Sequence, residues 1–116
     1  GYAKVSKQLR ASWSDMIESY LINSPDLVGL VLLLDCRREP TGEDIELIEW
    51  LAGRQLPVLA VITKTDKITR DKTNRKVKQV ETELGIPALP FSIKSGVGKR
   101  ELTGAIQDLV AEYTNR

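Results

Sequence analysis

The sequence predicts a three-layer α/β/α fold, in which one parallel β-sheet lies between two layers of helices. Segments with helical periodicity alternate with short apolar runs, in the order helix, strand, helix, strand, helix, strand, helix. The run over residues 28–34 is continuously apolar, as expected for a parallel strand covered on both faces. This order implies right-handed crossovers, which place helices on both faces of the sheet.

Length and composition fit one globular domain over residues 1–116. Apolar residues make up 41% and charged residues 28%, and the net charge of +1 gives no general attraction to nucleic acid or membrane. No apolar run reaches the roughly 18 residues that cross a bilayer, and the single cysteine, Cys36, cannot form an intrachain disulfide. These features predict a cytoplasmic protein. The absence of histidine argues against triad hydrolysis and most zinc sites.

The first two predicted elements are an amphipathic helix over about 6–22 and a strand over 28–34. The helix ends before the Asn-Ser-Pro stretch at 23–25, because proline disfavours helix in the residue before it. Trp13 lies on its apolar stripe and is predicted to belong to the core. The strand ends in a carboxylate, Asp35.

Two more helices and a second strand follow in the middle of the chain. Thr41 is suited to cap a helix that ends near Gly53. Residues 57–63 form the second buried strand. Thr69 caps a third helix, which stops at Gly85 because glycine readily adopts the left-handed conformation that ends helices.

The last predicted elements are a short strand over 88–92 and a C-terminal helix. That helix has the clearest apolar stripe in the sequence, formed by Leu102, Ile106, Leu109, Val110 and Tyr113. Trp50 lies on the apolar stripe of the earlier helix that begins after Thr41, and we expect it in the core.

Ligands of such sheets bind beyond the carboxyl ends of the strands, which here means near Asp35, residues 63–67 and residues 92–98. The second of these stretches contains Thr63, Lys64 and Asp66 in the pattern of a [N/T]KxD base-recognition motif. Guanine presents N1–H and an amino group side by side, and one carboxylate can accept both hydrogen bonds. Adenine has a bare acceptor at N1, so it would face Asp66 with repulsion. The alternative is a solvated turn with a helix-capping aspartate.

A second loop strengthens this interpretation. Ser92, Ile93 and Lys94 follow the third strand and resemble the SAK loop of GTPases, whose backbone N–H groups meet the guanine O6. Ile93 stands where alanine is usual, which a backbone donor tolerates. The alternative is an ordinary strand-to-helix loop. Two such motifs at the same edge, in the correct order, favour guanine recognition.

Further stretches resemble one family, the EngB/YsxC/YihA-type bacterial GTPases. Residues 1–7 are similar to the segment after the DxPG motif of that family, and residues 32–44 are similar to its LLLDxRxxPTxxD stretch. The resemblance implies a partial P-loop NTPase (Ras-like) G domain that binds GTP or GDP. It assigns Gly1, Tyr2, Ala3 and Lys4 to the tail of switch II, although a frayed terminus is the alternative. It assigns the guanine site to Thr63, Lys64, Asp66, Lys67, Ser92, Ile93 and Lys94.

The phosphate-binding half of a G domain has no counterpart in the sequence. No G-x-x-x-x-G-K-[ST] loop occurs, so we expect no catalytic or metal-binding residue in this chain and no GTP hydrolysis by it alone. GTP hydrolysis and Mg²⁺ binding would belong to the full-length protein. A bare apolar edge at 28–34 would favour aggregation, so we expect an N-terminal G-domain segment or a partner chain to pair with that strand.

Residues 64–78 contain seven lysines and arginines against two acids, which suggests contact with ribosomal RNA phosphates or, alternatively, only a solvated helix. The family resemblance implies a role in large ribosomal subunit assembly, with indirect effects on cell division and septation. Two other interpretations stay open. A receiver-like phosphoacceptor domain would use Asp35, Thr63 and Lys94 but lacks the earlier acidic pair for magnesium. A noncatalytic RNA or protein interaction module would use the basic helix alone.

Overall fold

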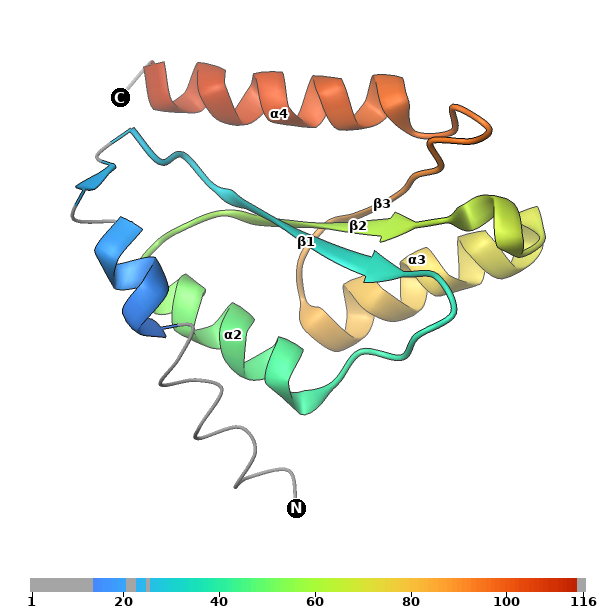
Figure 1. Cartoon of the computed structure of the whole chain (residues 1–116), viewed down its shortest axis with the longest axis horizontal. Coiled ribbons are helices and arrows are strands. Elements are labelled where there is room, and N and C mark those ends of the chain that lie inside the picture. Colours follow the sequence, from blue (N-terminus) through green and yellow to red (C-terminus); the bar gives the residue numbers. More distant parts are fainter. Residues whose placement is uncertain (1–13, 21–22, 25, 115–116) are drawn as a thin grey trace.

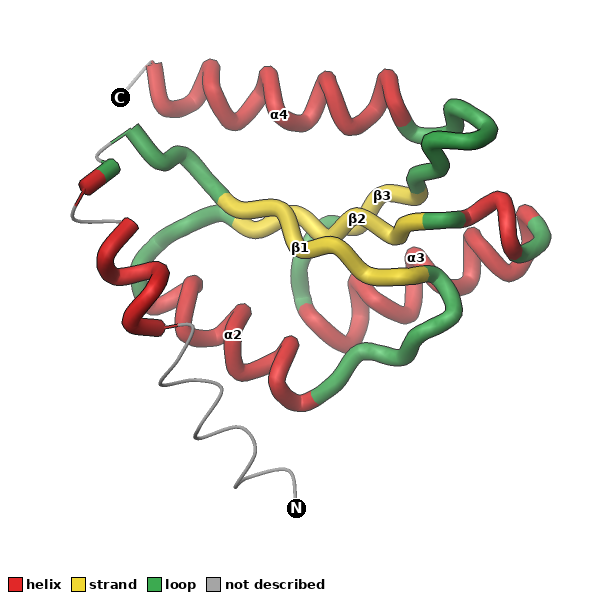
Figure 2. The backbone as a smooth tube through the Cα atoms, viewed as in Figure 1, coloured by secondary structure: helices red, strands yellow, loops and turns green. Residues whose placement is uncertain are grey.

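The computed structural model describes residues 14–20, 23–24 and 26–114 (Figures 1 and 2). Residues 14–20 are helical, which agrees with the described part of the first predicted helix. Trp13 and residues 1–4 lie outside the described residues. The elements that follow are β1 (Leu30–Asp35), α2 (Gly42–Gly53), β2 (Val58–Thr63), a short 3₁₀-helix η1 (Thr65–Lys67), α3 (Arg70–Leu84), β3 (Ala88–Pro90) and α4 (Lys99–Thr114).

The three strands form one parallel sheet in the order β1-β2-β3. Leu30 pairs with Val58 and the register continues to Asp35 opposite Thr63, so β1 and β2 end at the same level. Each predicted strand is present, with ends shifted by one or two residues. Within the described residues β1 pairs with β2 alone, and it therefore forms an edge of the sheet.

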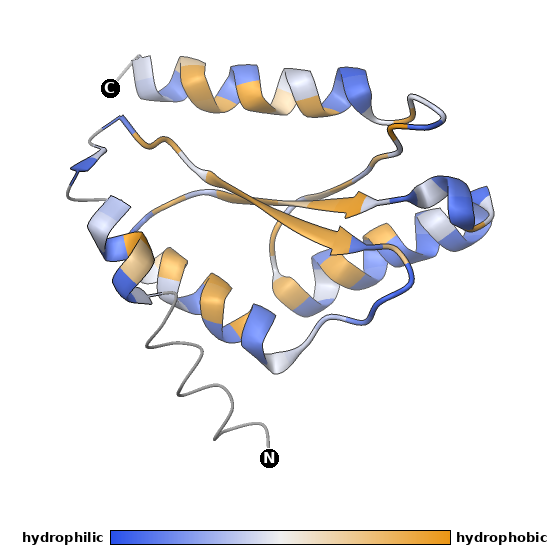
Figure 3. Cartoon of the chain, viewed as in Figure 1, coloured by the Kyte–Doolittle hydropathy of each residue, from blue (hydrophilic) through white to orange (hydrophobic). Residues whose placement is uncertain are grey.

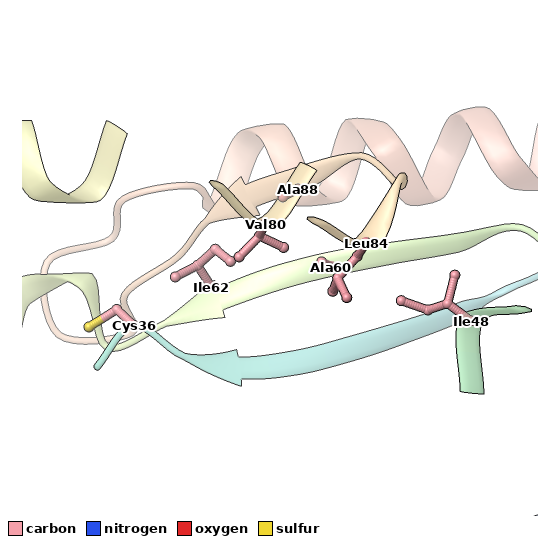
Figure 4. Close-up of a cluster of buried hydrophobic side chains, with 7 residues drawn as sticks. All are labelled: Cys36, Ile48, Ala60, Ile62, Val80, Leu84 and Ala88. Carbon is pink, nitrogen blue, oxygen red and sulfur yellow. The ribbon is translucent and has the colours of Figure 1, made fainter. Parts of the chain in front are cut away.

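Helices cover both faces of the sheet, which confirms the predicted three-layer α/β/α arrangement (Figure 1). Helices α2 and α3 lie on one face and α4 on the other, and the apolar strands run between them (Figure 3). Fully burying an aliphatic side chain stabilises a fold by about 1.5–3 kcal/mol, so the layer between the sheet and α2/α3 contributes strongly to the stability of the fold. Its buried core is Cys36, Ile48, Ala60, Ile62, Val80, Leu84 and Ala88 (Figure 4).

Local signals set the helix ends. The Thr41 hydroxyl accepts from the Asp44 backbone N–H at 3.2 Å, and Asp44 Oδ2 accepts from the Thr41 N–H at 2.9 Å, which makes a capping box at the start of α2. Thr69 caps α3 through the backbone N–H of Lys72 at 3.2 Å. Gly85 ends α3 in the left-handed conformation, with φ 66°.

Trp50 differs from the prediction because it is only half-buried and stands outside the buried core. The Arg54 guanidinium lies 3.8 Å from the centre of its ring and covers part of it. The helical stripe therefore predicted which side of α2 Trp50 occupies, but not how deeply the sheet would bury it.

The α4 face of the sheet is more open than the α2/α3 face. None of the described residues of α4 is fully buried. On β1, Val31 is 42% and Leu33 is 68% exposed, whereas Leu32 and Leu34, which pack against the α2/α3 core, are half-buried. None of the helices in the described part of the chain is long and apolar enough to span a bilayer.

Candidate functional site

The two predicted recognition loops lie side by side at the carboxyl edge of the sheet. The backbone N–H and the hydroxyl of Thr65 both donate to the Phe91 carbonyl oxygen, at 3.3 and 3.2 Å. Phe91 in turn donates its N–H to the Ile62 carbonyl at 2.8 Å. These bonds bridge the end of β2 and the end of β3, so one small ligand can touch both loops.

Asp66 and Ser92 form the direct link between the loops. The Ser92 hydroxyl donates to Asp66 Oδ1 at 2.7 Å and accepts the backbone N–H of Ser95 at 3.1 Å. Ser92 is 1% exposed, so it is a fixed point under the exposed carboxylate. The Ser92 hydrogen bond lowers the pKa of Asp66, which keeps this group ionised at neutral pH. A carboxylate accepts about four hydrogen bonds, so acceptor capacity remains for a ligand.

The loop over 92–98 closes on itself. Ser92 N–H donates to Val97 O at 3.0 Å, and Gly96 N–H donates to Ser92 O at 2.8 Å. Gly98 has φ 83°, and a Cβ at this position would overlap the Pro90 carbonyl, so only glycine fits there. Ile93 is 90% exposed, and its side chain takes no part in the packing.

Lys64 connects the loop over residues 63–67 to the end of β1. It has a left-handed backbone, with φ 59° and ψ 35°. Its carbonyl accepts the Lys67 N–H at 2.9 Å and the Cys36 thiol at 3.2 Å. Its ammonium lies 3.8 Å from Asp35 Oδ2. The sequence indicated Asp35 as a residue at the functional edge, but no local signal could have shown that Asp35 and Cys36 both contact Lys64.

A pocket of about 590 Å³ opens between these loops. Six of the seven predicted guanine-site residues line it, and the seventh, Ser92, supports it through Asp66. The remaining lining is apolar and comes from β1, β2, α4 and Phe91, the residue that follows β3. The pocket residues are Leu33, Val61, Thr63, Lys64, Asp66, Lys67, Phe91, Ile93, Lys94 and Leu102. Apolar walls beside one ionised carboxylate suit a planar base that carries neighbouring N–H donors.

The described residues do not fit a magnesium ion. They contain no group of three or more His, Cys, Asp or Glu side chains that could hold a metal. Mg²⁺ prefers near-octahedral oxygen coordination and usually binds through carboxylates and phosphates together.

A second cleft, of about 310 Å³, lies on the other side of the β1 end, and we call it the cationic cleft. Lys76 is only 8% exposed, and its ammonium lies 3.3 Å from Glu39 Oε1. The Gln79 amide also donates to Glu39, and this bond together with Lys76 lowers the pKa of Glu39. The residues that line the cleft are Cys36, Arg37, Glu39, Ile68, Lys72, Arg75, Lys76 and Gln79.

The fold defines the class of protein, a three-layer α/β/α domain built on one parallel sheet. The chain is structurally similar to translation elongation factor SelB from Methanococcus maripaludis in its apo form, with a TM-score of 0.63 and 22% identity. The similarity covers 74% of this chain and 21% of SelB. At this identity, the likeness concerns the fold alone.

The sequence relatives of the chain are named as probable GTP-binding protein EngB. A probable EngB of Gemmatimonas aurantiaca is 40% identical over 114 residues, which cover 96% of this chain and 56% of the relative. A probable EngB of Levilactobacillus brevis is 45% identical over 103 residues, which cover 85% of this chain and 52% of the relative. These relatives confirm the predicted resemblance to EngB. The chain spans about half the length of the curated relatives it matches. No protein-family model matches it.

Proposed function

We propose that this chain is the guanine-recognising part of a GTP-binding protein of the EngB type. The observation that carries the proposal is the hydrogen bond between Ser92 and Asp66, which fixes one ionised carboxylate at the mouth of the pocket between two loops. Guanine N1–H and its 2-amino group would both donate to Asp66. Adenine offers neither donor at these positions, so the same carboxylate would reject it.

The other pocket residues have complementary roles in the proposal. The methylene stem of Lys64 would lie over the purine ring while its ammonium stays near Asp35. Backbone N–H groups near Ile93 and Lys94 would meet the guanine O6. The exposed Ile93 side chain supports this role, because a backbone donor does not depend on the residue type.

The phosphates of GTP or GDP, and Mg²⁺, would be bound outside this chain, in the full-length cytoplasmic protein. We propose that a further G-domain segment pairs with the strand over 28–34. The edge position of β1, which pairs with β2 alone among the described residues, supports this proposal, because an apolar strand with an unpaired backbone edge favours further pairing. The chain alone would then bind guanine nucleotides weakly and leave GTP unhydrolysed.

Large ribosomal subunit assembly, with indirect effects on cell division and septation, is the cellular role we propose for the full-length protein. The cationic cleft supports an RNA partner, because Lys72, Arg75 and Lys76 lie there against one carboxylate, Glu39. Such a surface attracts the phosphates of an RNA backbone.

The hydrogen bonding of Asp35 argues against the receiver-like alternative. This carboxylate accepts three hydrogen bonds from Arg37, at 2.9, 3.0 and 2.9 Å, and lies near Lys64. A carboxylate engaged in this way is a poor phosphoryl acceptor, so acetyl phosphate should leave the protein unmodified.

NMR titration of the ¹⁵N-labelled chain with GDP and with ADP tests the guanine proposal, because this method measures affinities as weak as the millimolar range. We expect GDP to bind at least about tenfold more tightly than ADP, since each charge-assisted hydrogen bond contributes about that factor. Asp66→Ala should remove the preference, whereas Asp108→Ala, which deletes an exposed carboxylate on α4, should keep it. Equal affinity for both nucleotides in the unmutated chain would refute the proposal.

A further inference from the structure

The end of β1 holds Lys64 at two points, its carbonyl and its ammonium. We propose that Asp35 is a positioning residue for base recognition, which acts by fixing the Lys64 side chain beside the pocket. The inference rests on the proposed guanine site, because Lys64 is one of the residues that line it. Asp35 itself does not line that pocket, so its effect would pass through Lys64.

The backbone of Lys64 is the first part of this arrangement. Residues other than glycine rarely adopt φ near 59°, and they keep this conformation only where the surroundings hold them. Here the Cys36 thiol donates to the Lys64 carbonyl at 3.2 Å, and Cys36 N–H donates to Thr63 O at 3.0 Å. Cys36 therefore binds the carbonyl groups of the two peptides that flank Lys64, and it is 4% exposed.

The Lys64 side chain is the second part. Its ammonium is 3.8 Å from Asp35 Oδ2, with side-chain exposures of 61% for Lys64 and 20% for Asp35. Lysine has a long, mobile stem, so one ionic contact at its tip removes much of its freedom. Without Asp35, the ammonium would sample solvent and the stem would leave the pocket wall.

Asp35 is itself immobilised. Arg37 donates to Oδ1 from its backbone N–H at 2.9 Å and from Nε at 3.0 Å, and Arg37 Nη2 donates to Oδ2 at 2.9 Å. These hydrogen bonds from Arg37 hold the pKa of Asp35 well below its usual range, so the group keeps its charge. The two-point Arg37 contact fixes the plane of the carboxylate and hence the place where Lys64 meets it.

This arrangement predicts a specific pattern in binding. Ordering Lys64 in advance lowers the entropic cost of placing a purine against its stem, and this benefit is the same for guanine and adenine. Selectivity comes from Asp66 and should not change. Loss of Asp35 should therefore weaken affinity while leaving the ratio of GDP to ADP affinity intact.

A double-mutant cycle between Asp35→Asn and Lys64→Met tests the proposal by NMR titration of the full 116-residue chain. Lys64→Met keeps an apolar stem and removes the ammonium. Because exposed ion pairs are weak, we expect Asp35→Asn to lower GDP affinity about two- to fivefold and to have no further effect in a chain that already carries Lys64→Met. Asp108→Asn, with the same charge change on α4, should leave affinity unchanged. Arg37→Lys, which keeps the charge but loses the two-point contact, should give a smaller loss in the same direction.

Three results would overturn the inference. Unchanged GDP affinity in Asp35→Asn would show that Lys64 needs no such support. If Asp35→Asn lowered GDP affinity by the same factor with and without Lys64→Met, Asp35 would act only on the fold. A chain that fails to prefer GDP before any mutation would remove the guanine site itself, and that result is distinct because it appears in the unmutated protein.

Discussion

The two clefts that border the end of β1 differ in how they would choose a ligand. The proposed guanine pocket, between the loops over residues 63–67 and 92–94, has apolar walls, three lysines and one carboxylate, Asp66, held by a buried serine. The cationic cleft has four cationic side chains along its lining and one carboxylate, Glu39. The first arrangement selects by short hydrogen bonds and the second by long-range charge. One sheet edge thus supports two kinds of recognition: Asp35 pairs with Lys64 of the proposed guanine pocket, whereas Cys36 and Arg37 line the cationic cleft.

The largest expected effect is a change of base preference in Asp66→Asn. The side-chain oxygen of asparagine can still accept a hydrogen bond from a purine N1–H. Its NH₂ group, however, donates a hydrogen bond at the position where the second carboxylate oxygen of Asp66 accepted one. Xanthine has a carbonyl oxygen at C2 in place of the guanine amino group, so it should gain the hydrogen bond that guanine loses. We expect GDP affinity to fall and xanthosine diphosphate affinity to rise, each about tenfold or more.

NMR titration with both diphosphates measures this swap. If Asp66→Asn still prefers GDP, then Asp66 does not contact the base and the contrast between the clefts is lost. RNA binding should be the same in this variant as in the unmutated chain, because Asp66 lies outside the cationic cleft.

The next largest effect concerns how RNA affinity depends on salt concentration. The double variant Lys72→Ala/Arg75→Ala removes two cations from the cationic cleft. For a single-stranded RNA, the slope of log affinity against log salt should become shallower by about 1.4, while GDP binding stays unchanged. Fluorescence anisotropy with a labelled oligoribonucleotide at several salt concentrations provides the slopes.

The matched control is Lys99→Ala/Arg100→Ala, which removes the same charge from exposed positions of α4. It should leave the slope close to that of the unmutated chain. Equal slopes for the two double variants would mean that RNA contacts the whole surface without using this cleft.

A smaller effect follows from the pKa of Asp66, which the Ser92 hydrogen bond lowers. A carboxyl group with a depressed folded-state pKa stabilises the fold at pH values above its unfolded pKa of about 3.9, and this contribution is lost as pH falls through the folded-state pKa. Ser92→Ala should raise the pKa of Asp66 toward the ordinary value and weaken GDP binding a few-fold. NMR titration of the Asp66 side-chain carboxyl carbon measures the shift directly.

Ser95→Ala serves as its control, because it keeps the backbone N–H that Ser92 accepts and does not touch Asp66. A pKa of Asp66 that stays low in Ser92→Ala would mean that another group orients this carboxylate.

The smallest effect is expected at Cys36, which lines the cationic cleft and donates to the Lys64 carbonyl. Burial raises the pKa of its thiol, so the thiol stays protonated and can donate to the Lys64 carbonyl. Cys36→Ser keeps a donor and should retain GDP affinity, whereas Cys36→Val loses it and should weaken GDP binding about twofold, since a thiol donates weakly. Equal GDP affinities of the Cys36→Ser and Cys36→Val variants would assign Cys36 to packing alone.

Much of the candidate site could be predicted because its residues are fixed by chain order. Asp66 and Ser92 each follow a buried strand, and parallel strands bring their carboxyl ends to one edge. The helix ends were equally readable, since Thr41, Thr69 and Gly85 act on backbone groups within a few residues of themselves. Contacts of this kind need no knowledge of distant packing.

The sequence alone therefore determined the order of helices and strands, the parallel sheet and the two loops that would meet a base. Only the tertiary structure decided which distant polar groups meet, such as Asp35 with Lys64, or Glu39 with Lys76 across the cationic cleft. It also left Trp50 half-buried. The physical reason is range: periodicity and capping depend on neighbours along the chain, whereas ion pairs, thiol hydrogen bonds and burial depend on how separate elements pack.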